Sequence, residues 1–293
     1  MIAAAMLLSA CGGKNTEVPS ESTSGAGTSE AVTETDADAA EQTDAQGEEG
    51  GGETAETEEL PKPFIESETL SKMSEDGEQE LVSMLCDEIY LENEGYGELA
   101  GNLAQYNHAA IKNAESLLEE LSEGAQEDYE FEKENGGTFN AYTSESRITV
   151  TRADAKILSY RRDTYEYTGG AHPISGSNGF TFDSQTGEEL LLSEVVDDLD
   201  GLYETLIEKL EAFSEENGGN VLFEEYADTV KSAVYSTVIE GTDTLAELQW
   251  TLGETGMTVY FNPYDVAPYA AGQITIELPY EDHKDLFSEA VLK

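Results

Sequence analysis

The clearest periodic pattern in the chain is helical and lies between residues 98 and 123. Apolar side chains recur there at every third or fourth position, which places them on one face of a helix, and Gly124 marks its predicted end. A second helix is predicted from Asp200 to Gly218, and a third over residues 222–234. The pattern therefore predicts several amphipathic helices.

Alternation of apolar and polar residues, which is typical of half-buried strands, occupies other parts of the chain. The predicted strands are residues 147–152, 156–167, 179–183, 248–252, 257–261 and 274–278. Residues 79–91 fit both a helix and a strand, and residues 280–292 are predicted to form a short helix. Strand groups segregated from helices in this way indicate an α+β fold, with an antiparallel β-sheet packed with several α-helices.

Two aromatic, alternating segments flank a glycine-rich connection between Tyr165 and Gly187. The segments on either side are predicted strands, and residues 183–187 have the composition of a tight turn. Glycines at positions 169, 170, 176 and 179 indicate backbone angles or close approaches that a side chain would forbid. We interpret Gly169, Gly170, His172, Asp183 and Gly187 as a structural motif.

The amino terminus is apolar and small, and it ends in Leu8-Ser9-Ala10-Cys11. It resembles a bacterial lipoprotein signal peptide, which is cut before a cysteine that becomes lipid-modified. The run is too short to span a bilayer, which needs about 20 helical residues. We therefore expect residues 1–11 to be a signal, and lipid at Cys11 to anchor the protein at the cell surface, on the outer face of the cytoplasmic membrane. The alternative is a short buried segment.

Residues 12–60 contain serine, threonine, glutamate, alanine and glycine but no aromatic residue. Such a segment cannot bury enough apolar surface to offset the entropy of ordering, so it is predicted to be a disordered acidic linker. The remaining residues, 61–293, are predicted to form the folded module. They could divide into two subdomains, residues 61–187 and 188–293.

The chain carries 63 acidic and 14 basic residues, a formal net charge of −49. Nucleic acid is excluded as a partner, because phosphate binding needs clustered lysine and arginine. An anionic membrane surface is repelled for the same reason, so attachment depends on lipid at Cys11. A cationic partner would be steered toward this surface, although simple solubility outside the cell explains the charge equally well.

Few residues stand out as candidates for chemistry. His172 follows two glycines, and we expect its imidazole to bond the turn backbone, because His108 and His283 show no ligand spacing to it. The acidic run at Asp197, Asp198 and Asp200 lacks the spacing of a calcium loop and is interpreted as a solvated helix start. Cys86 is expected to be a small core residue. We predict no cofactor, no metal site and no catalytic residue.

Three tyrosines are the best candidates for an interaction surface, because tyrosine brings a large area and a polar tip to interfaces. They are Tyr264, Tyr269 and Tyr280. The alternative is that their rings pack the segment around them onto the sheet.

Two separated groups of residues carry a family resemblance. The first comprises residues 165–172, Phe182-Asp183 and Thr186-Gly187 with the leucines after them, and the second is the segment 261–272, from Phe261-Asn-Pro-Tyr to Ala-Ala-Gly272. Over about residues 65–290 the chain resembles the extracytoplasmic sensing module of RsiV-type anti-sigma factors. That module also occurs in PdaC-type peptidoglycan deacetylases and in many lipoproteins. The resemblance implies an α/β module with an antiparallel sheet, and it favours a strand for residues 79–91.

The resemblance also sets expectations for function. In RsiV the module binds lysozyme, whereas the deacetylases carry their chemistry in a separate domain, for which no residues are left over between Pro61 and Lys293. We therefore expect a non-enzymatic extracellular binding module, with lysozyme or another cell-surface or cell-wall component as its candidate ligand. The alternative is an accessory or cryptic cell-wall-modifying enzyme domain.

Overall fold

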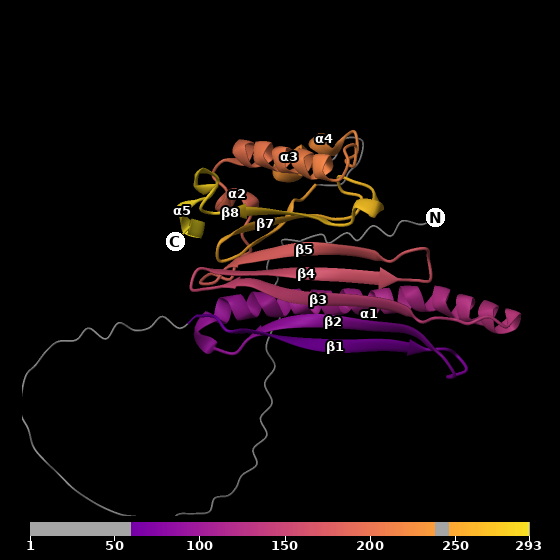
Figure 1. The fold of residues 1–293 in the computed structure, drawn as a ribbon. Helices are drawn as coiled ribbons and strands as arrows, with labels where there is room; N and C mark the ends of the chain where they lie inside the picture. The colour runs from indigo at the N-terminus through magenta and orange to yellow at the C-terminus, as the bar shows by residue number, and fades with distance from the viewer. Residues whose placement is uncertain (1–59, 238–245, 293) are drawn as a thin grey trace, which may run out of the picture. The chain divides into compact units, whose positions relative to one another are not determined.

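Two β-sheets and the helices that cover them make up the described residues, 60–237 and 246–292 of a computed structural model (Figure 1). The α+β class predicted from the sequence is confirmed. The predicted signal peptide with Cys11, and all but the last residue of the predicted linker, lie outside the described residues. The boundary predicted at residue 187 falls between the last strand of the first sheet and the first helix beside the second.

The first sheet has five strands in chain order. They are β1 (Pro63–Met73), β2 (Glu80–Leu91), β3 (Tyr142–Ala153), β4 (Ile157–Tyr167) and β5 (Ile174–Asp183). All neighbours are antiparallel except β2 and β3, which are parallel. The sheet is thus mixed rather than antiparallel, because the long helix α1 (Gly97–Asn135) returns the chain to the end from which β2 began. β1 was not predicted, because most of its side chains are exposed and its apolar residues do not alternate.

The strand favoured for residues 79–91 is confirmed as β2. Its buried side chains include Val82, Met84 and Cys86, which are less than 5% exposed. The Cys86 thiol is free and buried, as predicted, and burial raises its pKa.

Helix α1 has 39 residues and runs past Gly124, so its predicted end was wrong. The segment beyond Gly124 is rich in charge but still buries Ala125 and Tyr129 against Tyr142 and neighbouring residues of the sheet. The helix ends instead at Gly136, which adopts φ +69° and donates its N–H to Glu132 O. Tertiary packing of two apolar side chains therefore overrides the glycine as a stop.

The second sheet is antiparallel and also follows chain order. Its strands are β6 (Gln249–Leu252), β7 (Gly256–Phe261) and β8 (Ile274–Pro279), so the predicted hairpin and last strand are confirmed. The helices α2 (Leu192–Val195), α3 (Leu199–Glu216) and α4 (Tyr226–Val234) share one hydrophobic core with it, in which Leu202, Leu206 and Leu210 of α3 are fully buried. Figure 1 shows α3 and α4 on the side of β7 and β8 that is turned away from the first sheet.

The prediction of one short helix over residues 280–292 is wrong. The chain forms a turn, a 3-10 helix η3 (Lys284–Leu286) and one helical turn α5 (Glu289–Leu292). Backbone hydrogen bonds to residues at the end of α2 and just after it separate η3 from α5. Leu286 O accepts from Asp197 N, and Ser288 N donates to Val195 O. Contacts to a distant segment thus interrupt a locally helical pattern.

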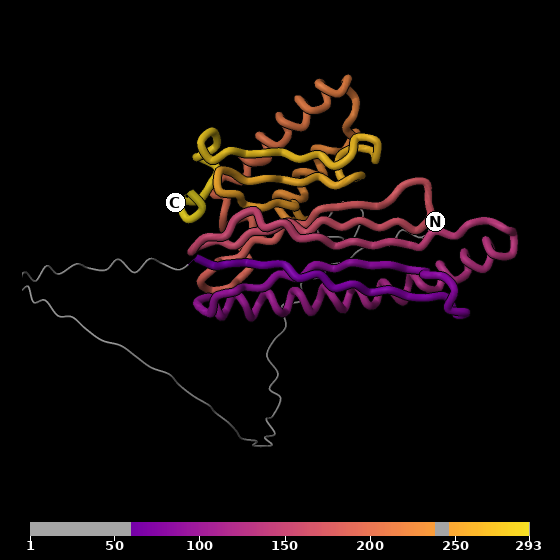
Figure 2. The backbone as a smooth tube through the Cα atoms, turned by 60° about the horizontal axis from the view of Figure 1, so that its bottom comes forward, coloured from indigo at the N-terminus to yellow at the C-terminus, as the bar shows by residue number. Residues whose placement is uncertain are grey.

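The two sheets meet where β6 crosses β4 and β5, on the face of the first sheet opposite to α1 (Figure 2). Leu252 N donates to Ser159 Oγ of β4 at 3.0 Å, and Thr151 Oγ1 of β3 donates to Leu252 O at 2.8 Å. At the closest point, a Cβ on Gly179 of β5 would lie 1.7 Å from Trp250 O. Only glycine fits there, which explains one of the four glycines singled out in the sequence.

Gly179→Ala is expected to lower the free energy of unfolding by about 3 kcal/mol or more, because the added methyl group meets backbone rather than a movable side chain. Gly170→Ala is the matched control: a Cβ there has no neighbour closer than 4.0 Å, so we expect a change within about 1 kcal/mol. Chemical denaturation of the two variants measures both values. Equal stabilities would contradict the close approach of β6 to β5.

Candidate functional site

The candidate site is the tyrosine loop, which we define as residues 262–273 between β7 and β8. A tight turn opens it: Asp265 N donates to Asn262 O at 3.0 Å, and Asn262 N donates to Asp265 Oδ2 at 2.7 Å. Desolvation of the carboxyl group raises the pKa of Asp265 to about 6, and the hydrogen bond from Asn262 N opposes the rise. A 3-10 helix η2 (Tyr269–Ala271) follows and ends at Gly272, which has φ +70°. The loop is therefore held by its own backbone bonds.

The side chain of Asn262 fixes the loop to the free edge of β5. Its Oδ1 accepts from Ser177 N at 2.7 Å, and its Nδ2 donates to Ser177 O at 3.1 Å. The amide thus takes the place that a neighbouring strand would have beside Ser177. Gln273 Nε2 also donates to Asn262 Oδ1 at 2.9 Å. Gly176 lies beside this contact, and a Cβ there would be in ordinary van der Waals contact with Asn262 Cγ at 3.4 Å, so the contact does not require glycine.

The tyrosine loop also contacts the glycine-rich connection between β4 and β5. The imidazole of His172 stacks on the ring of Tyr269 with 3.8 Å between ring centroids and 19° between planes. His172 Nδ1 lies 3.0 Å from the Pro173 carbonyl oxygen, and the residue is exposed. Tyr264 completes the group, with its ring centroid 6.0 Å from that of Tyr269. Two segments about ninety residues apart thus form one exposed aromatic surface, which we call the His–Tyr surface (His172, Tyr264 and Tyr269).

Tyr264 has an unusual backbone for its residue type. Its φ is +77°, and 58% of the residue is exposed. A left-handed conformation costs a non-glycine residue about 1–2 kcal/mol, and an exposed ring does not recover this cost by burial. Packing onto the sheet therefore does not explain a tyrosine at this position.

Tyr280, the third tyrosine singled out, lies elsewhere. It follows the far end of β8, where its ring packs edge-to-face on Phe287 with 5.0 Å between centroids. Its hydroxyl donates to Gly253 O at 3.2 Å and accepts from Arg152 Nη1 at 3.4 Å. Burial raises the pKa of the Tyr280 hydroxyl. This tyrosine packs the end of the second sheet and is not part of the His–Tyr surface.

The turn after β5 is a scaffold. Asp183 Oδ1 accepts from Gln185 N and Thr186 N at 2.8 Å each, and Asp183 O accepts from Gly187 N at 2.8 Å. Gly187 has φ +72°, and a Cβ on it would lie 2.6 Å from Glu98 C at the start of α1. Gly169 has φ +81°, whereas Gly170 has neither a positive φ nor a close neighbour. Gly169, Asp183 and Gly187 thus have conformational reasons for their residue types, whereas nothing in the structure explains glycine at position 170.

The remaining candidates do not assemble into a reaction centre. His108 is exposed on α1, and His283 precedes η3. Asp198 caps α3, with its Oδ1 accepting from Gly201 N at 2.9 Å, in agreement with the predicted helix start. In residues 60–237 and 246–292, no group of three or more His, Cys, Asp or Glu side chains could hold a metal ion. None of the helices in this described part is long and apolar enough to cross a membrane.

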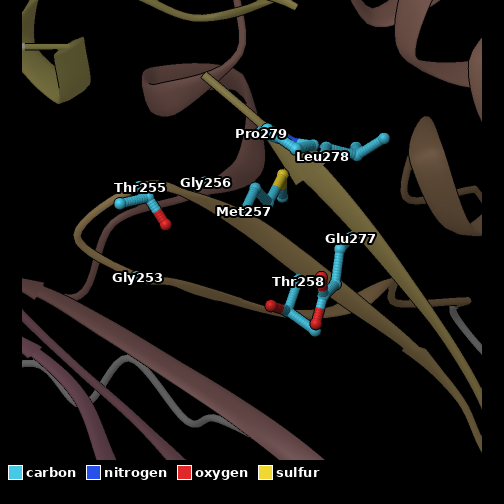
Figure 3. Close-up of a pocket in the computed structure, with 8 residues that line it drawn as sticks. All are labelled: Gly253, Thr255, Gly256, Met257, Thr258, Glu277, Leu278 and Pro279. Carbon is cyan, nitrogen blue, oxygen red and sulfur yellow. The ribbon is translucent and has the colours of Figure 1, made fainter. Parts of the chain in front are cut away.

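A shallow pocket of about 160 Å³ lies at the turn between β6 and β7 (Figure 3). Figure 3 shows Thr258 and Glu277 beside each other on neighbouring strands, while Gly253, Thr255 and Gly256 form the turn. One carboxylate and two hydroxyls on a strand surface form no paired acid and base. The pocket therefore has no catalytic arrangement, and the tyrosine loop remains the candidate site.

Residues 197–281 match the family described as "Protein of unknown function (DUF3298)", and residues 93–175 match "Deacetylase PdaC". The chain combines a PdaC-type region with a DUF3298 region. The PdaC-type region extends from just before α1 to the start of β5, and the DUF3298 region contains the whole tyrosine loop. The PdaC part of the resemblance is confirmed, and the likeness to RsiV stays a prediction.

One solved structure agrees with this assignment at the level of the fold. A DUF3298 family member from Bacteroides fragilis is 20% identical, with a TM-score of 0.55 over 78% of this chain and 95% of that chain. A DUF3298 family protein from Pseudomonas aeruginosa is 16% identical, with a TM-score of 0.45 over 78% of this chain and 96% of that chain. Comparison with the curated proteins finds no match.

Asn262→Ala is expected to release the tyrosine loop from β5. It leaves Ser177 N and O without their partner, which should cost about 1–3 kcal/mol in the free energy of unfolding. Amide hydrogen exchange should quicken in residues 262–273 before it quickens elsewhere.

Asn178→Ala is the control for this variant, since Asn178 is the neighbouring residue on β5 and its side chain forms none of the contacts to the loop. We expect its stability to change by less than about 0.5 kcal/mol. Unchanged exchange in the loop of the Asn262 variant would show that the amide does not anchor it.

Proposed function

We propose that this chain is a lipid-anchored, extracellular, non-enzymatic binding module whose ligand is lysozyme or another cationic component of the cell surface or cell wall. The observation that carries the proposal is Tyr264, which is exposed and strained at φ +77°. Strain at a residue that gains no burial is characteristic of functional positions. The Tyr264 ring lies 6.0 Å from that of Tyr269, tilted by 34°, on a loop anchored to β5, and Tyr269 in turn stacks on His172. The ring of Tyr264 is thus preorganised to contact a partner.

Charge supports the choice of a cationic partner. The 63 acidic residues outnumber the 14 basic ones by 49, and such a field raises the association rate of a cationic protein at low ionic strength. The RsiV-like residues support lysozyme in particular. Attachment through Cys11 to the outer face of the cytoplasmic membrane is part of the proposal and rests on the sequence of the amino terminus.

The rival proposal is an accessory or cryptic cell-wall-modifying enzyme domain. It requires His172 to work with a carboxylate or a bound metal ion. The imidazole instead has an aromatic ring on its face and a backbone carbonyl at Nδ1. These contacts favour the binding role.

Titration of the protein with lysozyme by calorimetry tests the proposal. Wild type should bind, and the affinity should fall between low and moderate salt because the Debye length shrinks to about 8 Å at 0.15 M ionic strength. No binding at either salt concentration would exclude lysozyme as the ligand. Equal binding of a charge-reversed lysozyme would exclude the steering effect.

Tyr264→Gly separates binding from folding. Glycine accepts the positive φ, so the free energy of unfolding should rise by up to about 1 kcal/mol, while loss of the ring should weaken lysozyme binding at least about tenfold. Phe131→Ala is the control, because Phe131 is an exposed aromatic residue on α1 (63% exposed) outside the His–Tyr surface. Equal weakening by both variants would contradict the assignment of the binding surface.

A further inference from the structure

All four arginines of this acidic chain lie on two neighbouring strands, at positions 147 and 152 of β3 and 161 and 162 of β4. Leu158 and Tyr160 share a core with Leu99 and Leu103 of α1. Because side chains alternate along a strand, Arg161, Asp163 and Tyr165 therefore lie on the opposite face of the sheet. The second sheet covers part of that face, where β6 contacts β4 and β5 and where Tyr260 of β7 reaches Arg161.

A cleft of about 270 Å³ lies on this face, beside the end of the tyrosine loop. It is lined by Arg161, Asp163 and Thr164 of β4, Ser175 to Ser177 of β5, and Gln273. Its volume is slightly below the range of about 300–1,000 Å³ that is usual for drug-sized ligands, so it suits a single small ring. The cleft is separate from the pocket of Figure 3, which lies at the other end of β7 and β8.

The charges in the cleft are paired with each other. Arg161 donates from Nε and Nη2 to Asp163 Oδ2 at 3.0 and 2.7 Å, and Ser177 Oγ donates to Asp163 Oδ1 at 2.5 Å. The guanidinium of Arg161 also lies over the ring of Tyr260, with Cζ 5.4 Å from the ring centroid, in a cation–π contact. A free anion in the cleft would face Asp163, and a free cation would face Arg161. The paired charges therefore favour a neutral ligand that both donates and accepts hydrogen bonds.

The neighbouring groups fit a hydroxyl-rich ring. The side chains of Arg161 and Asp163 are each about one-third exposed. The guanidinium can therefore still donate, and the carboxylate can still accept, hydrogen bonds on the solvent side. Ser175 is an exposed hydroxyl on β5, and it faces Tyr165 across the strand pair, an aromatic residue that is 40% exposed. Vicinal hydroxyl groups of a sugar can accept from the guanidinium and donate to the carboxylate at once, while an exposed ring covers a sugar's apolar face.

We propose that this cleft binds one neutral saccharide unit through its hydroxyl groups. Arg161 and Asp163 supply the charged donor and acceptor, Gln273 also lines the cleft, and Tyr165 is paired with the lining residue Ser175 on the neighbouring strand. The site does not depend on the protein-binding role proposed above, because the His–Tyr surface contributes none of its lining residues.

The test is a titration of the full chain with three neutral trisaccharides, followed by nuclear magnetic resonance. The probes are cellotriose, maltotriose and the β-1,4-linked trimer of N-acetylglucosamine. At least one should bind saturably in the millimolar range, and the amide shifts should centre on residues 161–165 and 175–177. Saturable binding with shifts elsewhere, or no saturation with any probe, would overturn the proposal.

Ser175→Tyr supplies the decisive variant, because a bulky ring at this exposed position of β5 fills the cleft without entering the core. We expect trisaccharide binding to weaken at least tenfold. Ser71→Tyr is the matched control. Ser71 is an exposed serine on β1 that lies on the same face of the first sheet as Ser175, so this variant should bind as wild type.

Two further outcomes decide the ligand class and the independence of the site. Acetate or phosphate that binds at residues 161–177 more tightly than the sugars would overturn the neutral-ligand assignment. Tyr264→Gly should bind the trisaccharide as wild type even if it loses lysozyme, so failure of one proposal is distinguishable from failure of the other. Unfolding temperatures within a few degrees of wild type confirm that each variant is folded.

Discussion

The close approach of the second sheet to β5 is the constraint on which the rest of the structure depends. Gly179 lets the backbone of β6 pass at Trp250, and the side-chain amide of Asn262 bonds Ser177 nearby on β5. Gln249 Oε1 accepts from Gly179 N at 3.2 Å between these points. An edge strand normally presents unpaired donors and acceptors to other chains. Here side-chain amides occupy them, so the contact that joins the two sheets also fixes the tyrosine loop.

Side chains also serve as hydrogen-bond partners of the backbone where β2 and β3 separate. Their parallel pairing ends at Cys86 and Ser146. Beyond it, Asp87 Oδ2 accepts from Ile148 N at 2.9 Å, and Asn107 of α1 bonds both N and O of Ile89. Arg162 donates to Asp87 O at 3.0 Å. Asp87 and Arg162 are 5% and 8% exposed, and buried groups of this kind are tolerated because their hydrogen bonds are made. This network joins α1 to the sheet that carries the cleft.

Sequence periodicity predicted the elements whose burial is decided locally. The α3 stripe and the β6–β7 hairpin are examples, because each presents one apolar face to a single core. It failed where distant contacts decide the outcome, as in the extension of α1 beyond Gly124 and the interruption of residues 280–292. For the site, the sequence singled out His172, Tyr264 and Tyr269 but no anchor for them. Asn262 belongs to the segment 261–272 that carries the family resemblance, but the sequence pattern assigned it no role. Its partner Ser177 lies 85 residues away, and only the fold brings β5 beside it. Tyr280 was grouped with the other tyrosines through residue type and lies at the opposite end of β8.

One rigid scaffold thus presents one exposed aromatic surface. Hydrogen–deuterium exchange with and without saturating lysozyme tests most directly the claim that the His–Tyr surface contacts the ligand. Protection should concentrate in residues 262–273 and 169–176, with α1 and β1 unchanged. Protection confined to other segments, at a concentration where calorimetry shows the protein to be bound, would contradict the claim.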